Sequence, residues 1–210
     1  MWLGCLATPA LASESGAVTY TQDFPGSDPE HYSISLKPDA SGAYECVGRI
    51  SQDSEDTETY QTTFQFSDAT RHKILELAAQ AQYFSGKIDS GKKVAFTGNK
   101  ELSYKDGTRD FSAEYNYSLL PAVQQLTALF QSIGATLEFG RRLVHLHRYQ
   151  KLALDEELKT MEAQAHKGDL GELQSVKPIL QEIYDDAAVI NIVRARALRI
   201  MEMGNGGAGR

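Results

Sequence analysis

The spacing of apolar residues changes near residue 118, and this change constrains the fold more than any other feature of the chain. Before it, apolar and polar residues alternate in short runs such as HYSISLK, AYECVGRI and YQTTFQF, which is the pattern of half-buried β-strands. After it, apolar residues recur every three or four positions, as in Leu119, Val123, Leu126 and Phe130, which is typical of helices that pack along one edge. The sequence therefore predicts an α+β protein, with strands first and helices second.

Residues 31–117 are predicted to form an α+β domain, an antiparallel sheet covered on one face by a single helix. The helix is expected over residues 69–84, where apolar side chains recur at helical spacing after Ser67 or Asp68, residue types that cap helices well. Alternating runs predict three strands before this helix and about three after it. The helix would then cover the apolar face that the strands share.

The dipeptide Asp106-Gly107 separates two alternating runs, ELSYK and TRDFSAEYN, and predicts the turn of a β-hairpin. Both central positions of a tight two-residue turn need positive φ, which Asp and Gly tolerate. Such a turn places Leu102 opposite Phe111. A further strand is predicted just before this hairpin, at VAFT.

Residues 118–203 are predicted to form a C-terminal hairpin of long helices, which either packs back on the sheet or projects from it. Asp169 and Glu172 have the spacing of a capping box for the last helix, and Pro178 should bend that helix because it lacks a backbone donor. The apolar seams have a mean period near the 3.5 residues of a coiled coil. A homodimer formed through the helices is therefore the alternative to an intramolecular pair. Residues 204–210, rich in Gly, are expected to be a disordered tail.

The N-terminus carries the features of an exported protein. Residues 1–12, MWLGCLATPALA, form an apolar run that ends in the small-x-small pattern of a signal-peptide cleavage site. Lys and Arg are missing before this run, so a truncated signal peptide is expected, an ordinary buried N-terminal segment being the alternative. Residues 13–30, rich in Ser, Gly, Pro and acids, are predicted to be a loose extended lead-in. We expect a bacterial periplasmic or secreted protein.

The charge distribution limits the classes of partner. The net charge is -7, and residues 1–120 carry 17 acidic against 10 basic side chains. This balance argues against a nucleic-acid interface, which needs a positive surface. No run after residue 12 approaches the roughly 18 apolar residues of a transmembrane segment, although peripheral membrane contact stays open.

Five arginines would gather at one end of the helical hairpin if its turn lies near residues 167–168: Arg141, Arg142, Arg194, Arg196 and Arg199. Clustered guanidinium groups bind phosphate or carboxylate groups bidentately, so an anion or lipid-headgroup site is one hypothesis. A solvated helix flank paired to local acids is the simpler interpretation. The same turn would place Arg148 and Lys151 near Asp185 and Asp186.

Neither a metal site nor a cofactor is predicted. His145 and His147 are two positions apart on a helix and so face away from each other. Glu162 and His166 have ligand spacing, but the partner helix offers no second carboxylate–histidine pair. Gly98 and Gly107 are isolated, so no phosphate-binding loop is expected.

Catalysis is the second hypothesis, as an exported hydrolase that uses His72 or Cys46. A nucleophile needs a base within reach and a group that orients the base. Cys46 is predicted in the middle of a strand, where a lone cysteine usually behaves as a small buried apolar residue. No nucleophile elbow of the form G-x-S-x-G is present in the chain.

The layout of residues 31–117 resembles small secreted bacterial α+β domains that have no assigned function. The stretches HYSISLKPDASGAYECVGRI and ELSYKDGTRDFSAEYN carry the resemblance, which covers about half of the chain as a layout and not as a motif. Modules similar to β-lactamase inhibitors also layer a helix on a sheet, and this implies binding in preference to catalysis. We therefore expect an exported, non-catalytic interaction or structural protein that contacts another protein or a second copy of itself.

Overall fold

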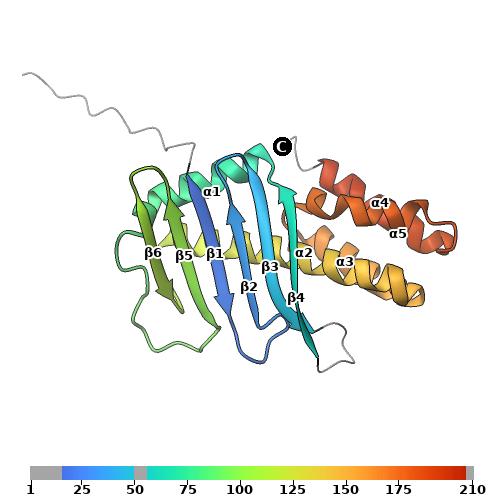
Figure 1. The fold of residues 1–210 in the computed structure, drawn as a ribbon, viewed down its shortest axis with the longest axis horizontal. Helices are drawn as coiled ribbons and strands as arrows, with labels where there is room; N and C mark the ends of the chain where they lie inside the picture. The colour runs from blue at the N-terminus through green and yellow to red at the C-terminus, as the bar shows by residue number, and fades with distance from the viewer. Residues whose placement is uncertain (1–15, 50–55, 207–210) are drawn as a thin grey trace, which may run out of the picture.

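A six-stranded antiparallel sheet forms one layer of the protein, in the order β4-β3-β2-β1-β5-β6. The computed structural model describes residues 16–49 and 56–206. Figure 1 shows the strands side by side, with the helices behind them and beyond β4. The strands are β1 (Ala17–Asp23), β2 (His31–Leu36), β3 (Ser41–Arg49), β4 (Thr57–Gln65), β5 (Asn99–Lys105) and β6 (Asp110–Tyr115).

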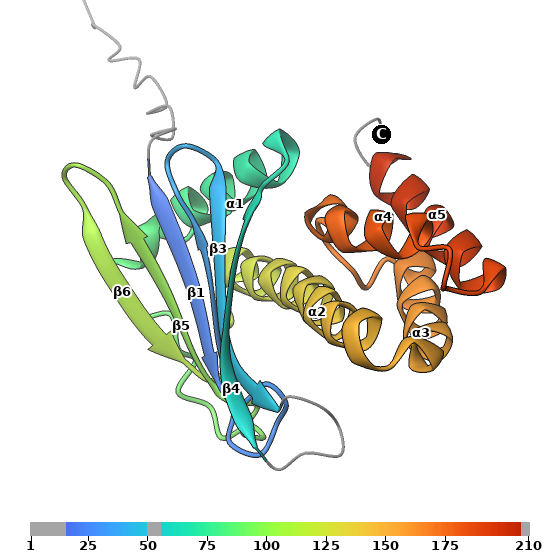
Figure 2. The same cartoon turned by 45° about the vertical axis from the view of Figure 1, so that its right-hand side comes forward.

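Helices cover only one face of the sheet (Figure 2). Alternation along the strands explains this, because Val18, Tyr20 and Ile34 point to the covered face and are fully buried. Serines and threonines point to the other face, where the hydroxyl groups of Thr19 and Ser35 are hydrogen-bonded across the strands at 2.9 Å. The predicted antiparallel sheet with a covering helix is therefore confirmed.

Two helices cover the apolar face, α1 (Asp68–Gln80) and the first half of α2 (Pro121–Tyr149). Ser67 caps α1 as expected, since its side chain accepts a hydrogen bond from the Thr70 amide. The helix predicted over residues 69–84 ends earlier, and a short 3-10 turn (Gln82–Phe84) follows it. Packing of the C-terminal helices on the sheet was one of the two alternatives that the sequence left open, and the first half of α2 packs in this way.

Two expectations about the strands are wrong. Residues 13–30 were expected to be a loose lead-in, but Ala17–Asp23 form β1, which pairs with both β2 and β5. Apolar and polar residues alternate in AVTYTQD, which explains why this segment is a strand, although the nearby Gly and Pro give the region the composition of a loop. VAFT was expected to be a strand, but residues 85–98 contain no strand.

The β5–β6 hairpin forms at the predicted place in a different register. Tyr104 lies opposite Phe111, and Leu102 opposite Ala113. The carboxylate of Asp106 accepts hydrogen bonds from the backbone amides of Thr108 and Arg109, at 2.8 and 2.7 Å. This side chain stabilises a longer turn than the two-residue turn that we predicted.

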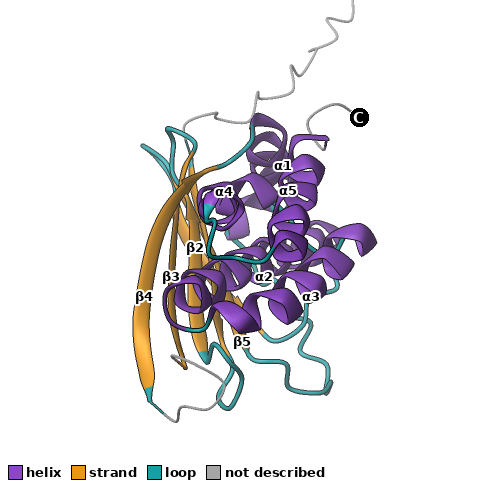
Figure 3. Cartoon of the chain, turned by 90° about the vertical axis from the view of Figure 1, so that its right-hand side faces the viewer, coloured by secondary structure: helices purple, strands orange, loops and turns teal. Residues whose placement is uncertain are grey.

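Helices account for the chain after residue 120, as expected, but a hairpin of two long helices is not what the structure shows. Following α2 come two 3-10 turns and three further helices: η2 (Lys151–Ala153), α3 (Leu154–Lys167), η3 (Leu173–Val176), α4 (Lys177–Asp185) and α5 (Asn191–Gly206). Figure 3 shows α3, α4 and α5 grouped beside α2. Pro178 lies at the start of α4, where it needs no backbone donor, instead of bending a longer helix.

The expected capping box at Asp169 and Glu172 is also wrong. Glu172 lies in the loop before η3, and its carboxylate accepts hydrogen bonds from the amide and hydroxyl of Ser67, at 2.8 and 2.7 Å. It therefore joins the start of α1 to the helical region. The tail was expected from residue 204, but α5 continues to Gly206; residues 207–210 lie outside the described part.

Two hydrophobic cores share α2. The first core lies between the sheet, α1 and α2 as far as Leu137. The second core begins at Phe139 and includes Leu143 of α2 with apolar residues of α3, α4 and α5. Most residues of the apolar seams are therefore buried within one chain, whereas Leu119 and Ile190 are 51% and 58% exposed. No helix among the described residues combines the length and apolar character needed to cross a bilayer.

Candidate functional site

A buried acid–base pair lies on α2 at the point where one core gives way to the other. Glu138 and Arg141 are each only 6% exposed, although both are charged residues. They lie one helical turn apart, and the Arg141 Nη2 donates to Glu138 Oε2 at 2.9 Å. Buried charges are costly unless they are paired, so this pair must be held by further contacts.

The carboxylate of Glu138 collects donors from the sheet. The Tyr44 hydroxyl donates to Oε1 at 2.5 Å, and the Cys46 thiol lies 3.3 Å from the same oxygen. Both residues belong to β3 and point to the covered face, because they are two positions apart on one strand. Together with Arg141, these donors occupy both oxygens of the carboxylate.

Arg141 ties the same helix to the end of β3. Its Nη1 donates to the backbone carbonyl of Arg49 at 2.8 Å. Burial lowers the pKa of Arg141, but hydrogen bonding and attraction to Glu138 outweigh it, and the net shift is upward. The guanidinium group is therefore permanently charged and neutralises Glu138 within the protein.

Burial also determines the protonation of the two β3 donors. It raises the pKa of the Cys46 thiol to about 12, and the nearby Glu138 charge acts in the same direction. The pKa of Tyr44 is raised by the same two causes. At neutral pH both groups keep their protons, so they serve as hydrogen-bond donors and not as nucleophiles.

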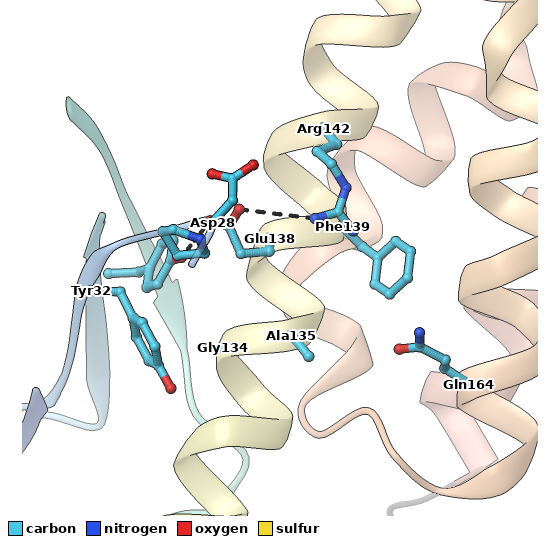
Figure 4. A pocket seen from close by; sticks show the side chains of 10 residues that line it. Asp28, Tyr32, Gly134, Ala135, Glu138, Phe139, Arg142 and Gln164 are labelled. Carbon is cyan, nitrogen blue, oxygen red and sulfur yellow. Dashed lines mark hydrogen bonds and ion pairs between the residues drawn. The ribbon is translucent and has the colours of Figure 1, made fainter. Parts of the chain in front are cut away.

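A pocket of about 290 Å³ opens beside this network, and we call it the junction pocket. Figure 4 shows α2 as its floor, with Tyr32 on the sheet side and Gln164 of α3 on the other side. Gly134 allows the Tyr32 ring to pack closely on α2, since a Cβ at this position would lie 3.2 Å from Tyr32 Cε2, and the small side chain of Ala135 leaves room beside it. The full lining is Asp28, Pro29, Tyr32, Tyr44, Gly134, Ala135, Glu138, Phe139, Arg142 and Gln164.

Arg142 connects the junction pocket to α3. Its Nε donates to Glu157 at 2.6 Å, and its Nη1 lies 4.0 Å from Glu138. The guanidinium carbon lies 4.6 Å from the centre of the Phe139 ring, which is a cation–π contact. The pocket thus combines a cation and two carboxylates with aromatic rings and amide and hydroxyl groups, and such groups can fix a small polar ligand.

The five arginines singled out in the sequence do not surround a common cavity. Arg141 and Arg142 are engaged as described above, and Arg194 donates to the carbonyl of Tyr184 at 2.6 Å. Arg196 and Arg199 both pair with Glu162, at 2.8 and 2.6 Å. Arg196 and Arg199 are thus paired to a local acid, whereas Arg141 is buried and Arg194 contacts a backbone carbonyl. Lys151 lies 2.6 Å from Asp186, as expected, but no ion pair between described residues joins Arg148 to Asp185 or Asp186.

Cys46 and His72, the residues proposed for catalysis, do not form a common site. Cys46 is fully buried against Glu138, whereas His72 lies on the exposed side of α1. His31 is paired with Asp23 at 2.6 Å. Within residues 16–49 and 56–206, no group of three or more His, Cys, Asp or Glu side chains is placed to hold a metal ion.

Glu138 and Tyr44 were not predicted from the sequence as members of a site. A signal was present, since Glu138 interrupts the apolar run between Leu137 and Phe139 and has an arginine at i+3. An acid inside an apolar helical stretch indicates a buried partner. The position of that partner on β3 is 94 residues away in the chain, and spacing rules do not reach that far.

Comparison with protein-family models finds no family that matches this chain, and comparison with curated proteins finds no relative. The function is therefore inferred from the residues themselves.

Proposed function

We propose that this protein is exported and acts by binding a small polar ligand in the junction pocket, without catalysing a reaction on it. The observation that carries the proposal is the composition of this pocket, in which polar and aromatic side chains of the sheet side, α2 and α3 converge. A volume of about 290 Å³ is at the lower end of the range for ligand pockets, which favours a ligand of few atoms.

The state of the neighbouring titratable groups supports binding over catalysis. A general base needs a free lone pair near the reacting proton, but the Glu138 oxygens already accept from Tyr44 and Arg141. A thiol nucleophile needs to ionise near neutral pH, and the Cys46 pKa of about 12 opposes this. The hydrolase alternative has no comparable support.

The lining also indicates the chemistry of the ligand. Tyr32 and Phe139 offer apolar ring surface, and Gln164 offers an amide that both donates and accepts. Arg142 offers a cation that Glu157 already pairs, and Asp28 offers a carboxylate. A ligand with an apolar ring or chain and one or two oxygen acceptors would use the rings, the cation and the amide. Simple carboxylic acids, amino acids and monosaccharides are the classes to test.

A thermal-shift screen with matched variants tests the proposal. Each compound is added at millimolar concentration, and a ligand that binds the folded state raises the melting midpoint in proportion to RT ln(1 + [L]/Kd). Ala135→Leu places extra atoms in the pocket and is expected to abolish the shift. Ala128→Leu, on the exposed side of the same helix, is the control and should keep it.

Absence of a shift from every compound, or an equal shift in Ala135→Leu, would contradict the ligand site. Export is tested separately, by expressing the gene with its own N-terminus in a bacterium. We expect the mature protein in the periplasm or medium, beginning at Ser13. An intact N-terminus on cytoplasmic protein would contradict export.

A further inference from the structure

Strand β4 forms one edge of the sheet, and no strand of the described residues lies on its outer side. Figure 3 looks onto this edge, and β4 lies in front of the other strands with no described element drawn across it. The strand is nine residues long, contains no Pro or Lys, and is rich in Thr. Pro and Lys are residues with which proteins usually protect long edge strands, because an unpaired edge readily accepts another strand.

The direction of the free backbone groups follows from the β3–β4 pairing. The Phe66 amide donates to the carbonyl of Ala40, which fixes the alternation of the antiparallel ladder. The backbone N–H and C=O groups therefore form hydrogen bonds with β3 at every β4 residue that lies an even number of positions from Phe66. At the other residues of β4 these backbone groups point outward, away from β3. The outward set is Thr57, Thr59, Gln61, Thr63 and Gln65.

A groove of about 450 Å³ runs between β4 and the last turns of α2. Glu58 and Tyr60 line it from the strand, and Val144, His145 and Tyr149 are among the residues that line it from the helix. Val144 and Tyr149 are 44% and 64% exposed, which is high for large apolar side chains. A strand added to β4 would direct every second side chain into this groove, since side chains alternate along a strand.

The charge of the groove indicates what those side chains should be. Arg148 lines the groove, and none of the ion pairs between described residues involves it. Arg141 also reaches this surface, although its charge is balanced by Glu138. Glu58 is the one acid in the lining and belongs to the strand. An acidic side chain on the added strand would therefore find its complement in Arg148 on the helix side.

We propose that the β4 edge and its groove bind an extended segment of another polypeptide, which adds a strand to the sheet and places acidic and apolar side chains against α2. The backbone of the segment would pair with the outward groups of Thr59, Gln61 and Thr63. Its acidic side chain would pair with Arg148, and its apolar side chain would pack on Val144 and Tyr149. This surface shares no lining residue with the junction pocket, so peptide binding here and ligand binding in the pocket can be tested independently.

The opposite edge of the sheet provides a matched control. In β6 the Asp106 amide donates to the Arg109 carbonyl, so Asp110, Ser112 and Glu114 direct their backbone groups outward. Proline at an outward position removes one free donor and no bond of the existing ladder. Gln61→Pro blocks the β4 edge, and Ser112→Pro makes the same change on β6.

Fluorescence anisotropy with the full chain tests the proposal. The probe is a labelled nine-residue peptide in which threonine alternates with aspartate and valine, and the control peptide carries lysine in place of aspartate. We expect a Kd on the order of 10–100 µM for the acidic peptide. Gln61→Pro and Arg148→Glu should each weaken it at least about tenfold, while Ser112→Pro and Ala135→Leu should bind it as the wild type does.

Circular dichroism and melting midpoints show whether each variant folds, and Arg148→Glu tests the groove independently of any proline. The proposal is overturned if the acidic peptide does not bind, if folded Gln61→Pro binds it equally well, or if the lysine peptide binds as tightly. A dimer in light scattering that Gln61→Pro dissociates would also overturn it, because the occupant would then be a second copy of the chain.

Discussion

The first core contains eight aromatic side chains among its 24 buried residues, whereas the second core is almost entirely aliphatic. Tyr20, Tyr44, Tyr104 and Phe130 are among the largest fully buried side chains between the sheet and its helices. In the second core, Phe139 is the one aromatic residue among the buried residues, and most of the others are leucine, isoleucine, valine and methionine. The two regions bury their apolar surface with different chemistry.

This difference determines where polar groups lie. A buried tyrosine carries a hydroxyl into the core, and that hydroxyl needs a partner. Tyr20 donates to Gln22 at 2.7 Å, and Tyr44 donates to Glu138. The described residues of the aliphatic core include no fully buried tyrosine, and the polar contacts of this core include the ion pairs of Glu162. The Arg196 Nε and the Ser175 hydroxyl are buried in the same helical region without a hydrogen-bond partner among the described residues. The buried hydrogen-bond network of Tyr44, Glu138 and Arg141 therefore lies at the edge of the core that contains the tyrosines.

Removing the boundary carboxylate should have the largest effect. Glu138→Leu leaves Arg141 charged and buried without its partner, and it also removes the acceptor of Tyr44. Breaking a buried pair in this way costs about 3–5 kcal/mol, so we expect a loss of this size in the free energy of unfolding, measured with denaturant. The double variant Glu138→Leu/Arg141→Met should be more stable than the single one. If it is less stable, the buried charge is not the cause.

Cavities made in each core show whether the two regions unfold separately. Leu102→Ala in the first core and Leu158→Ala in the second each remove a fully buried leucine, at a cost of about 2–5 kcal/mol. We expect Leu158→Ala to accelerate amide hydrogen exchange in α3 and α5 while β1 and β5 stay protected. Equal acceleration throughout the chain would mean that the cores open as one unit.

The thiol of Cys46 reports whether the aromatic side stays closed. Because burial raises its pKa to about 12 and it is fully covered, the thiol should not react with a disulfide reagent at pH 8. The Cys5→Ser variant removes the other thiol from the measurement. We expect stoichiometric reaction only after unfolding in guanidinium. Rapid labelling of the native protein would show that β3 separates from α2 under native conditions.

The smallest effect is expected at the surface of the aliphatic side, at Asp186. A hydrogen bond from Lys151 is the first cause that lowers the pKa of this carboxyl, and bonds from the Ala188 amide and from His147 add to it. Because the folded pKa is below the unfolded one, the stabilisation is present above about pH 4 and is lost as the pH falls further. Asp186→Asn should therefore lower the melting midpoint slightly at pH 7, and the difference should shrink at pH 3. A difference that persists at pH 3 would exclude this ionisation as its source.

The spacing of apolar residues within short segments predicted most of the individual strands and the start of the first helix. Alternation identified β2, β3 and β4, and the Ser67 cap marked the start of α1. Lys151 and Asp186 do lie together as predicted, although Lys151 belongs to η2 and Asp186 to the end of α4, and not to the long helical hairpin that the prediction assumed. The break between α4 and α5 was not predicted, because the apolar spacing continues across it without a change of period.

The candidate site depended on contacts that no spacing rule encodes. Tyr44 and Glu138 meet only because the sheet packs on α2, and Gln164 reaches the junction pocket only because α3 turns back beside it. The hairpin register shows the same limit on a smaller scale. The Asp106 side chain stabilises a turn longer than the predicted one, so every residue pair between β5 and β6 differs from the predicted register.

Helix α2 is unbroken from Pro121 to Tyr149, a length of about 43 Å at 1.5 Å per residue. One end is fixed among strands, and the other carries the three shorter helices. A tilt of about 5° at the sheet end would move the far end by about 4 Å over that length. A molecule that wedges beside the middle of α2 would therefore reorient everything beyond Tyr149, even though it touches only a few side chains.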